Sequence, residues 1–174
     1  KDGIILYPTD TIWGLGCDAT NRDAVRKIYD LKKREDSHSM LVLVDNEGKL
    51  ESYVEQVPDI AWQLLEVSDS PITIIYPDAK NLADNLIAAD KSIGIRITRE
   101  DFSSELIRRF RKPIVSTSAN ISGNPSPQRF DEIDEEIKNK VDYIVKYRQD
   151  DPTVSKPSSI IKIDVNGEFR IIRK

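Results

Sequence analysis

The stretch SIGIRIT, residues 92–98, indicates the fold class because its side chains alternate between two kinds. Isoleucines fill every second position, and the positions between them hold small or polar residues, namely Ser92, Gly94, Arg96 and Thr98. A period of two is typical of a β-strand whose faces meet different surroundings. The polar face either binds an anion through the Arg96 guanidinium or meets solvent, as in many antiparallel sheets.

Strands and helices on both sides of this stretch alternate irregularly. We expect strands at 3–8, 40–45, 71–77, 112–116, 141–147, 158–164 and 168–174, and helices at 20–34, 57–67, 99–110 and 129–140. Thr20 and Asp23 form a capping-box pattern at the first helix. Asn166-Gly167 is typical of a type I′ turn, which predicts an antiparallel final hairpin. The sequence therefore predicts one α/β domain over residues 1–174, with a twisted sheet of mixed parallel and antiparallel strands.

Composition narrows the class of protein. The 174 residues are 39% apolar, which suits one globular core, and no run of 18 apolar residues could span a membrane. A single cysteine, Cys17, excludes an internal disulfide and fits a reducing, cytoplasmic compartment. The net charge of −4 (26 − 30) does not suggest a nucleic-acid coat protein, although a local basic cleft remains compatible with it. Because the chain starts at Lys1, we expect further residues before it.

Two polar stretches follow expected strands. YPTDTIWGLGCDA, residues 7–19, places Thr9, Asp10 and Thr11 at a strand end, where ligands of open α/β sheets often bind. It contains neither a Rossmann fingerprint nor a P-loop, so a polar turn is the alternative. STSANISGNPSP, residues 116–127, offers hydroxyls and an amide that can bind a phosphate or carboxylate, or forms an Asx/Ser-rich loop.

Lys32 is the next inward-facing position after Val25, Ile28 and Tyr29 on the first helix. Its ammonium either reaches past the core to solvent, complements the C-terminal end of the helix dipole together with Arg34, or faces an anion in a cleft.

Five ordered stretches resemble those of the YrdC-type threonylcarbamoyl-AMP synthases: YPTDTIWGLGCDA, IYDLKKR, SIGIRI, STSANISGNPSP and PSSIIKI. The family's K-x-R and S-x-N motifs stand here as Lys32-Lys33-Arg34 and Ser118-Ala119-Asn120. The resemblance covers essentially the whole chain and implies a concave ligand cleft on the twisted sheet. It also implies an enzyme that condenses L-threonine, bicarbonate and ATP to threonylcarbamoyl-AMP and pyrophosphate, with Mg²⁺ held mainly by the nucleotide. The resemblance further implies a downstream transferase complex that completes the modification of tRNA, and tRNA itself as a candidate partner.

The resemblance also implies roles for individual residues. The catalytic set would be Lys32, Arg34, Ser118 and Asn120. The nucleotide would be bound by Arg34, His38, Ser92, Ser118, Ser126 and Arg173. Threonine would be bound by Thr9, Thr11, Arg96 and Ser116. We expect no protein-held metal.

Departures from the family pattern leave alternatives open. After K-x-R the family usually has proline and then a Lys-Pro-Leu-like segment, whereas residues 35–40 read EDSHSM here. This segment supports a paralogue of the YciO branch as one alternative, although the retained K-x-R and S-x-N motifs favour the synthase. A module that binds tRNA or double-stranded RNA through a basic concavity, without synthase activity, is a separate alternative, and the net charge of −4 does not favour it. Asp10 has three possible roles: deprotonating an amine, holding Mg²⁺, or capping a turn. The chain also ends at Lys174, so we expect it to lack the additional C-terminal domain of longer family members.

Overall fold

The computed structural model describes residues 2–33 and 40–174. Its strands are β1 (Ile5–Tyr7), β2 (Gly14–Gly16), β3 (Leu41–Val44), β4 (Ile72–Tyr76), β5 (Ile93–Ile97), β6 (Ile114–Ser118), β7 (Tyr143–Ile144), β8 (Ser159–Ile163) and β9 (Phe169–Arg173). Its α-helices are α1 (Arg22–Lys32), α2 (Leu50–Tyr53), α3 (Asp59–Val67), α4 (Asp101–Phe110) and α5 (Glu135–Lys140). Short 3₁₀ helices are η1 (Glu47–Lys49), η2 (Asp84–Leu86) and η3 (Phe130–Glu132).

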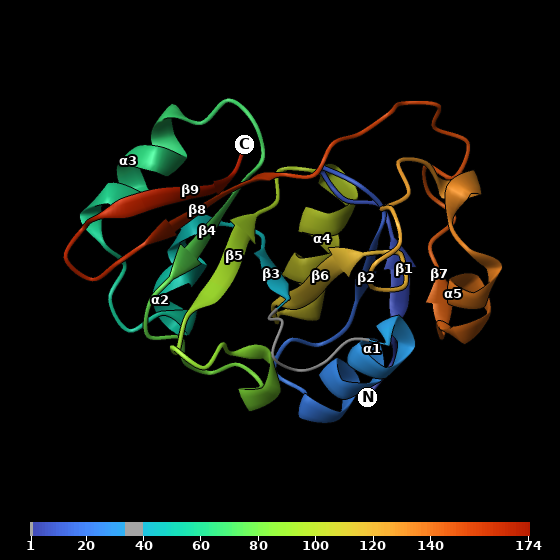
Figure 1. Cartoon of the computed structure of the whole chain (residues 1–174), viewed down its shortest axis with the longest axis horizontal. Helices are drawn as coiled ribbons and strands as arrows, with labels where there is room; N and C mark the ends of the chain where they lie inside the picture. Colours follow the sequence, from blue (N-terminus) through green and yellow to red (C-terminus); the bar gives the residue numbers. More distant parts are fainter. Residues whose placement is uncertain (1, 34–39) are drawn as a thin grey trace.

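The strands form one sheet in the order β7-β1-β2-β6-β3-β5-β4-β8-β9. The pairs β1·β7, β3·β5 and β4·β8 are parallel, and the other neighbours are antiparallel. The predicted mixed α/β sheet is therefore confirmed. Figure 1 shows β8 and β9 at one side of the molecule and β7 with α5 at the other, with the chain between β7 and β8 crossing from one side to the other.

Helices cover the sheet unequally. In one small cluster, Ile107 of α4 packs with Tyr7, Leu43 and Ile114 from the strands. The other α-helices contribute to a separate, larger cluster. Leu43 pairs with Arg96 in the β3·β5 register, so Arg96 lies on the sheet face that α4 covers. Beyond α4, that face remains open for a ligand. None of the helices in the described residues is both long and apolar enough to cross a membrane.

Strand β2 lies inside the stretch that the sequence predicts as a polar loop. Gly16 allows it to pair between β1 and β6, because a Cβ there would stand 2.6 Å from Cε1 of Tyr7 and 2.9 Å from the carbonyl oxygen of Val115. Only a residue without a side chain permits so close an approach. A short strand rich in glycine has low intrinsic strand propensity, and this explains why the sequence does not predict it.

The start of α1 differs from the capping-box prediction, which is wrong. Asn21 is the N-cap, and its side-chain oxygen accepts hydrogen bonds from the backbone N–H of Asp23 and Ala24. The Thr20 hydroxyl instead donates to Asp18 at 2.6 Å. Asn is at least as good an N-cap as Thr, and the carboxylate of Asp18 engages the competing hydroxyl.

Two predictions for the last third of the chain are also wrong. The helix expected at 129–140 is divided into η3 and α5, because Ile133 is buried with extended backbone and Asp134 caps α5. The final hairpin does not use a type I′ turn, since Gly167 has φ +83° while Asn166 is not among the residues with positive φ. Gly167 donates its N–H to Asp164, and Asp164 donates to Glu168, as in a type I turn followed by a glycine bulge.

Gly16→Ala tests the close packing of β1, β2 and β6. We expect it to lower the free energy of unfolding by about 1–3 kcal/mol, because the added methyl has no room beside Tyr7 and Val115. Urea denaturation measures this. Gly3→Ala is the matched control, since its nearest neighbour would be 3.8 Å away. Equal stability of the two variants would contradict the packing described.

Candidate functional site

A cavity of about 240 Å³ opens on the sheet face beside α4. Its lining side chains come mainly from β3, β4, β5, β6, β8 and β9 and from the loop before β2. Segments far apart in the chain therefore meet in one depression, as expected for a binding site built on a twisted sheet.

One end of the cavity is rich in hydroxyl groups. The extended backbone of β6 places Ser116 and Ser118 on the same side, and both line the cavity with Thr11 and Ser126. Arg96 also lines the cavity, from the central strand β5, and is 3% exposed. Neutral hydroxyls beside a buried guanidinium form a surface that can hydrogen-bond an anion at several points.

The floor of the cavity is flat and apolar. Leu41, Ile75, Gly94 and Ile160 line it from adjacent strands. A Cβ on Gly94 would extend into this floor, 3.4 Å from Cγ2 of Thr73 and 3.6 Å from Cβ of Leu41. The absence of a side chain at Gly94 therefore leaves room for a flat ligand group.

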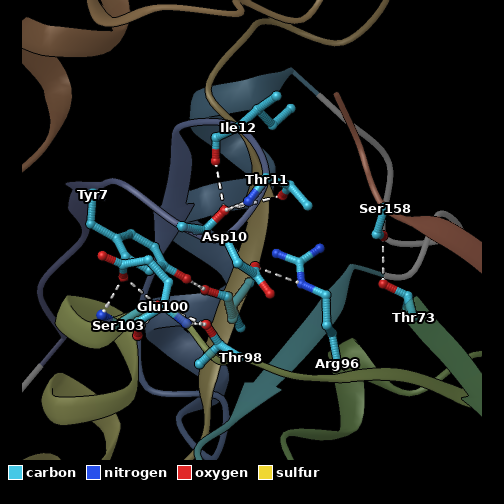
Figure 2. Close-up of polar contacts among 12 residues, drawn as sticks. Tyr7, Asp10, Thr11, Ile12, Thr73, Arg96, Thr98, Glu100, Ser103 and Ser158 are labelled. Atoms are coloured by element: carbon cyan, nitrogen blue, oxygen red, sulfur yellow. Dashed lines mark hydrogen bonds and ion pairs between the residues drawn. The ribbon is translucent and has the colours of Figure 1, made fainter. Parts of the chain in front are cut away.

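The loop before β2 is fixed by hydrogen bonds from Thr9. The Thr9 hydroxyl donates to the carbonyl of Ile12 at 2.8 Å and accepts from the backbone N–H of Thr11 at 3.1 Å (Figure 2). Thr9 is 2% exposed and does not line the main cavity. It therefore holds Thr11 in place rather than facing the cavity itself.

Arg96 forms a buried ion pair with Asp10 from the same loop. The Nε of Arg96 lies 3.1 Å from Oδ1 of Asp10, and the Asp10 side chain is 11% exposed (Figure 2). The two atoms attract electrostatically, but their orientation does not satisfy hydrogen-bond geometry. Burial raises the pKa of Asp10, and the charge of Arg96 opposes that effect. Arg96 is thus not the solvent-facing residue of the alternative interpretation.

A second guanidinium reaches the cavity from the edge strand β9. Arg173 lines the cavity and donates from Nε to the carbonyl of Ser158 at 2.9 Å. Burial, and then the positive charge of Arg96, lower the pKa of Arg173. Ser158 also hydrogen-bonds Thr73 through their hydroxyls at 2.7 Å, which connects the start of β8 to β4.

Lys32 is buried behind the hydroxyl-rich end. Its Nζ donates to the carbonyls of Ser118 and Asn120, both at 2.6 Å, and lies 3.3 Å from the side-chain oxygen of Asn120. Lys32 is 2% exposed, so the inward face predicted for α1 is confirmed. Its ammonium meets backbone carbonyls rather than solvent, and it fixes the course of the chain after β6.

The structure brings together some of the predicted site residues around the cavity. Those that line it are Thr11, Arg96, Ser116, Ser118, Ser126 and Arg173. Thr9, Lys32 and Asn120 lie behind its wall and bond to residues that form it. Ser92 does not line the cavity, and its hydroxyl donates to Asp90. Arg34 and His38 lie outside the described residues.

Sequence reasoning missed several residues that line the cavity: Met40, Leu41, Thr73, Ile75, Gly94, Ser158 and Ile160. The sequence does contain a pattern that assigns some of these residues to the cavity face. Thr73 and Ile75 share one parity of β4, as Gly94 and Arg96 do of β5, so alternation assigns each pair to one face. Nothing in the sequence indicates that Ser158 stands opposite Thr73, because that contact depends on the parallel pairing of β4 with β8.

Lys32→Met tests the anchoring of the segment after β6. We expect a loss of about 2–4 kcal/mol in the free energy of unfolding, because buried carbonyls of Ser118 and Asn120 lose a charged donor. Lys33→Met is the matched control, since Lys33 is 61% exposed and its ion pair with Glu136 is on the surface. Chemical denaturation of both variants gives the comparison, and losses of similar size would contradict the anchoring role.

Comparison with known proteins places the chain in a family. The family model described as Telomere recombination, which unites Sua5, YciO and YrdC, matches residues 1–174. A Methanocaldococcus jannaschii protein is 39% identical over 92% of this chain and 74% of its own length. The threonylcarbamoyl-AMP synthase of Pseudoalteromonas translucida is 32% identical over 95% of this chain and 88% of its own length.

Solved structures agree on the fold. The structure of P. abyssi Sua5 complexed with L-threonine superposes with a TM-score of 0.82 at 23% identity, over 93% of this chain. This chain spans 47% of that Sua5 chain. E. coli YciO superposes with a TM-score of 0.83 at 24% identity, over 99% of this chain and 82% of its own. With this sheet, this cavity and a family match over its whole length, the chain belongs to the Sua5/YciO/YrdC family.

Proposed function

We propose that the chain is an L-threonylcarbamoyl-AMP synthase, which condenses L-threonine, bicarbonate and ATP to threonylcarbamoyl-AMP and pyrophosphate. The observation that supports this best is that one cavity combines several hydroxyl groups, two arginines (Arg96 and Arg173) and an apolar floor. Such a cavity suits two substrates that must meet. The name of the Pseudoalteromonas translucida relative, and the threonine bound to P. abyssi Sua5, support the choice of reaction.

The amino acid would bind at the hydroxyl-rich end. The terminal nitrogens of Arg96 would hold the threonine carboxylate in bidentate fashion. Hydroxyls of Thr11 and Ser116 would contact the rest of the amino acid. Thr9 would act through Thr11, which it holds by hydrogen bonds.

The nucleotide would lie over the apolar floor. The adenine ring would cover Gly94 and Ile75, with its phosphates among Ser118, Ser126 and Arg173. Lys32 and Asn120 would keep Ser118 in position. The roles expected for Arg34, His38 and Ser92 at the nucleotide stay part of this proposal.

Among the residues that the structure describes, no group of three or more His, Cys, Asp or Glu side chains could hold a metal ion. That Mg²⁺ arrives with ATP and stays bound by the triphosphate and water is part of this proposal.

The chemistry requires positioning and charge neutralisation from the protein. Bicarbonate loses hydroxide to give carbon dioxide, and the threonine amine bonds to its carbon. The proton that the amine loses joins the hydroxide as water, which leaves a carbamate. A carbamate oxygen then attacks the α-phosphorus of ATP, and the bond to pyrophosphate breaks. Ser118, Ser126 and Arg173 would bind phosphate oxygens as their charge redistributes. The rigid sheet would hold the two substrates in contact, which supplies the entropic part of the catalysis.

The product, a mixed anhydride, must be consumed by a transferase that moves the threonylcarbamoyl group to an adenosine of tRNA. This would place the protein in the cytoplasm with a downstream partner complex. The YciO-like alternative gains no separate support from the fold, because the TM-scores with YciO and Sua5 are 0.83 and 0.82. The fold therefore favours neither branch.

Pyrophosphate release from ATP tests the proposed function. We expect release to require both L-threonine and bicarbonate. Arg96→Gln should lower kcat/KM for threonine by about 100-fold, because a charged bidentate contact is lost. Arg108→Gln is the matched control, since Arg108 is exposed on α4 and pairs with Glu105. Folded wild-type protein that releases no pyrophosphate in response to threonine would exclude the synthase and favour the YciO-like alternative.

Gly94→Val tests the place of the adenine ring. Valine suits a strand, so we expect the fold to persist. Its side chain would fill the floor beside Thr73 and Leu41 and raise KM for ATP by about tenfold or more, with a smaller effect on threonine binding. Titration with ATP and with threonine separately measures both, and Gly3→Val serves as a control outside the cavity. An unchanged affinity for ATP would place the base elsewhere.

A further inference from the structure

The two guanidinium groups of the cavity have different charge environments. Arg96 is paired with the carboxylate of Asp10, whereas Arg173 is held by the neutral carbonyl of Ser158. Within residues 2–33 and 40–174, Arg173 forms no ion pair with a carboxylate. The cavity therefore contains one arginine that is paired with a carboxylate and one for which the described residues provide no carboxylate partner.

Asp10 contacts Arg96, which lines the main cavity, from outside that cavity. It does not line the main cavity but a separate one of about 190 Å³, which also contacts Ser70 and Arg99. Figure 2 shows the Asp10 carboxylate at Nε of Arg96, with the terminal guanidinium nitrogens beyond this contact. Direct proton transfer to a substrate or direct metal binding in the cavity would need Asp10 at its surface. The position instead suits an electrostatic role.

A carboxylate in this position discriminates between anions by charge. Coulomb repulsion scales with the charge of the ligand, so a phosphate dianion at Arg96 is repelled by Asp10 about twice as strongly as a carboxylate. An amino acid also carries an ammonium group, which Asp10 attracts. Since burial weakens solvent screening, these differences are larger here than on the surface.

We propose that Asp10 is a specificity-determining residue, which reserves the part of the cavity at Arg96 for a zwitterionic amino acid and leaves phosphates to the part at Arg173. This inference rests on the proposed function, since it assigns the two parts to threonine and ATP. It also gives Asp10 a role distinct from deprotonating an amine, holding Mg²⁺ or capping a turn.

A competition experiment on the full chain tests this role. Isothermal titration calorimetry gives Kd for L-threonine, and added inorganic phosphate gives the inhibition constant for its displacement. In Asp10→Asn we expect the ratio of the phosphate constant to the threonine constant to fall by about tenfold or more, because the repulsion of the dianion is lost. Asp10→Ser, a smaller neutral residue, should give the same direction of change. Asp84→Asn is the matched control, since Asp84 forms an exposed ion pair with Arg22 and neither residue lines the cavity.

The outcomes separate the two proposals. Wild-type protein that binds threonine, with an unchanged ratio in both Asp10 variants, overturns the role of Asp10 and leaves the proposed function intact. Wild-type protein that does not bind threonine overturns both. The ratio is measured on each Asp10 variant that circular dichroism shows to be folded. A fall in the ratio confined to the Asp10 variants supports it.

Discussion

The site depends on the burial of a guanidinium in the middle of a β-sheet. Arg96 is 3% exposed, and a charged group so placed is costly unless an opposite charge and hydrogen-bonding groups compensate for it. Asp10 supplies the charge, and the hydrogen bonds of Thr9 fix the loop that carries Asp10. The loop in turn positions Thr11 and leads into β2. One buried cation thus determines the shape of the cavity wall on this side.

A second buried cation fixes another part of the wall. The ammonium of Lys32 donates hydrogen bonds to the carbonyls of Ser118 and Asn120, and these bonds link the end of α1 to the end of β6. The carbonyl of Ser118 also accepts from the backbone N–H of Asn120, so the lysine adds a charged donor to a turn that the backbone already forms. Two cations, one with a carboxylate and one with carbonyls, hold the polar segments after β1 and β6 in fixed positions around one depression.

The parts of this arrangement that follow from local pattern could be predicted from the sequence. Alternation in β5 assigned Arg96 and Gly94 to one face, and alternation of Ser116 and Ser118 did the same for β6. Strand β2 could not be predicted, because its three residues form a strand only where Gly16 lets it approach Val115. The contact between Thr73 and Ser158 could not be predicted either, since it depends on the register of a parallel pair 85 residues apart in sequence.

The fold alone does not select an activity within this family, because structures of two branches superpose on it equally well. The activity must therefore be determined by side chains on the same sheet. A change in charge can do this with the fewest substitutions. A sheet face that presents Arg96 and Arg173 without further carboxylates would bind phosphates at both ends. Placing one carboxylate behind one of the two arginines makes the ends unequal without altering the cavity surface. The distribution of buried charge, more than the shape of the cavity, would then decide which substrate occupies which end.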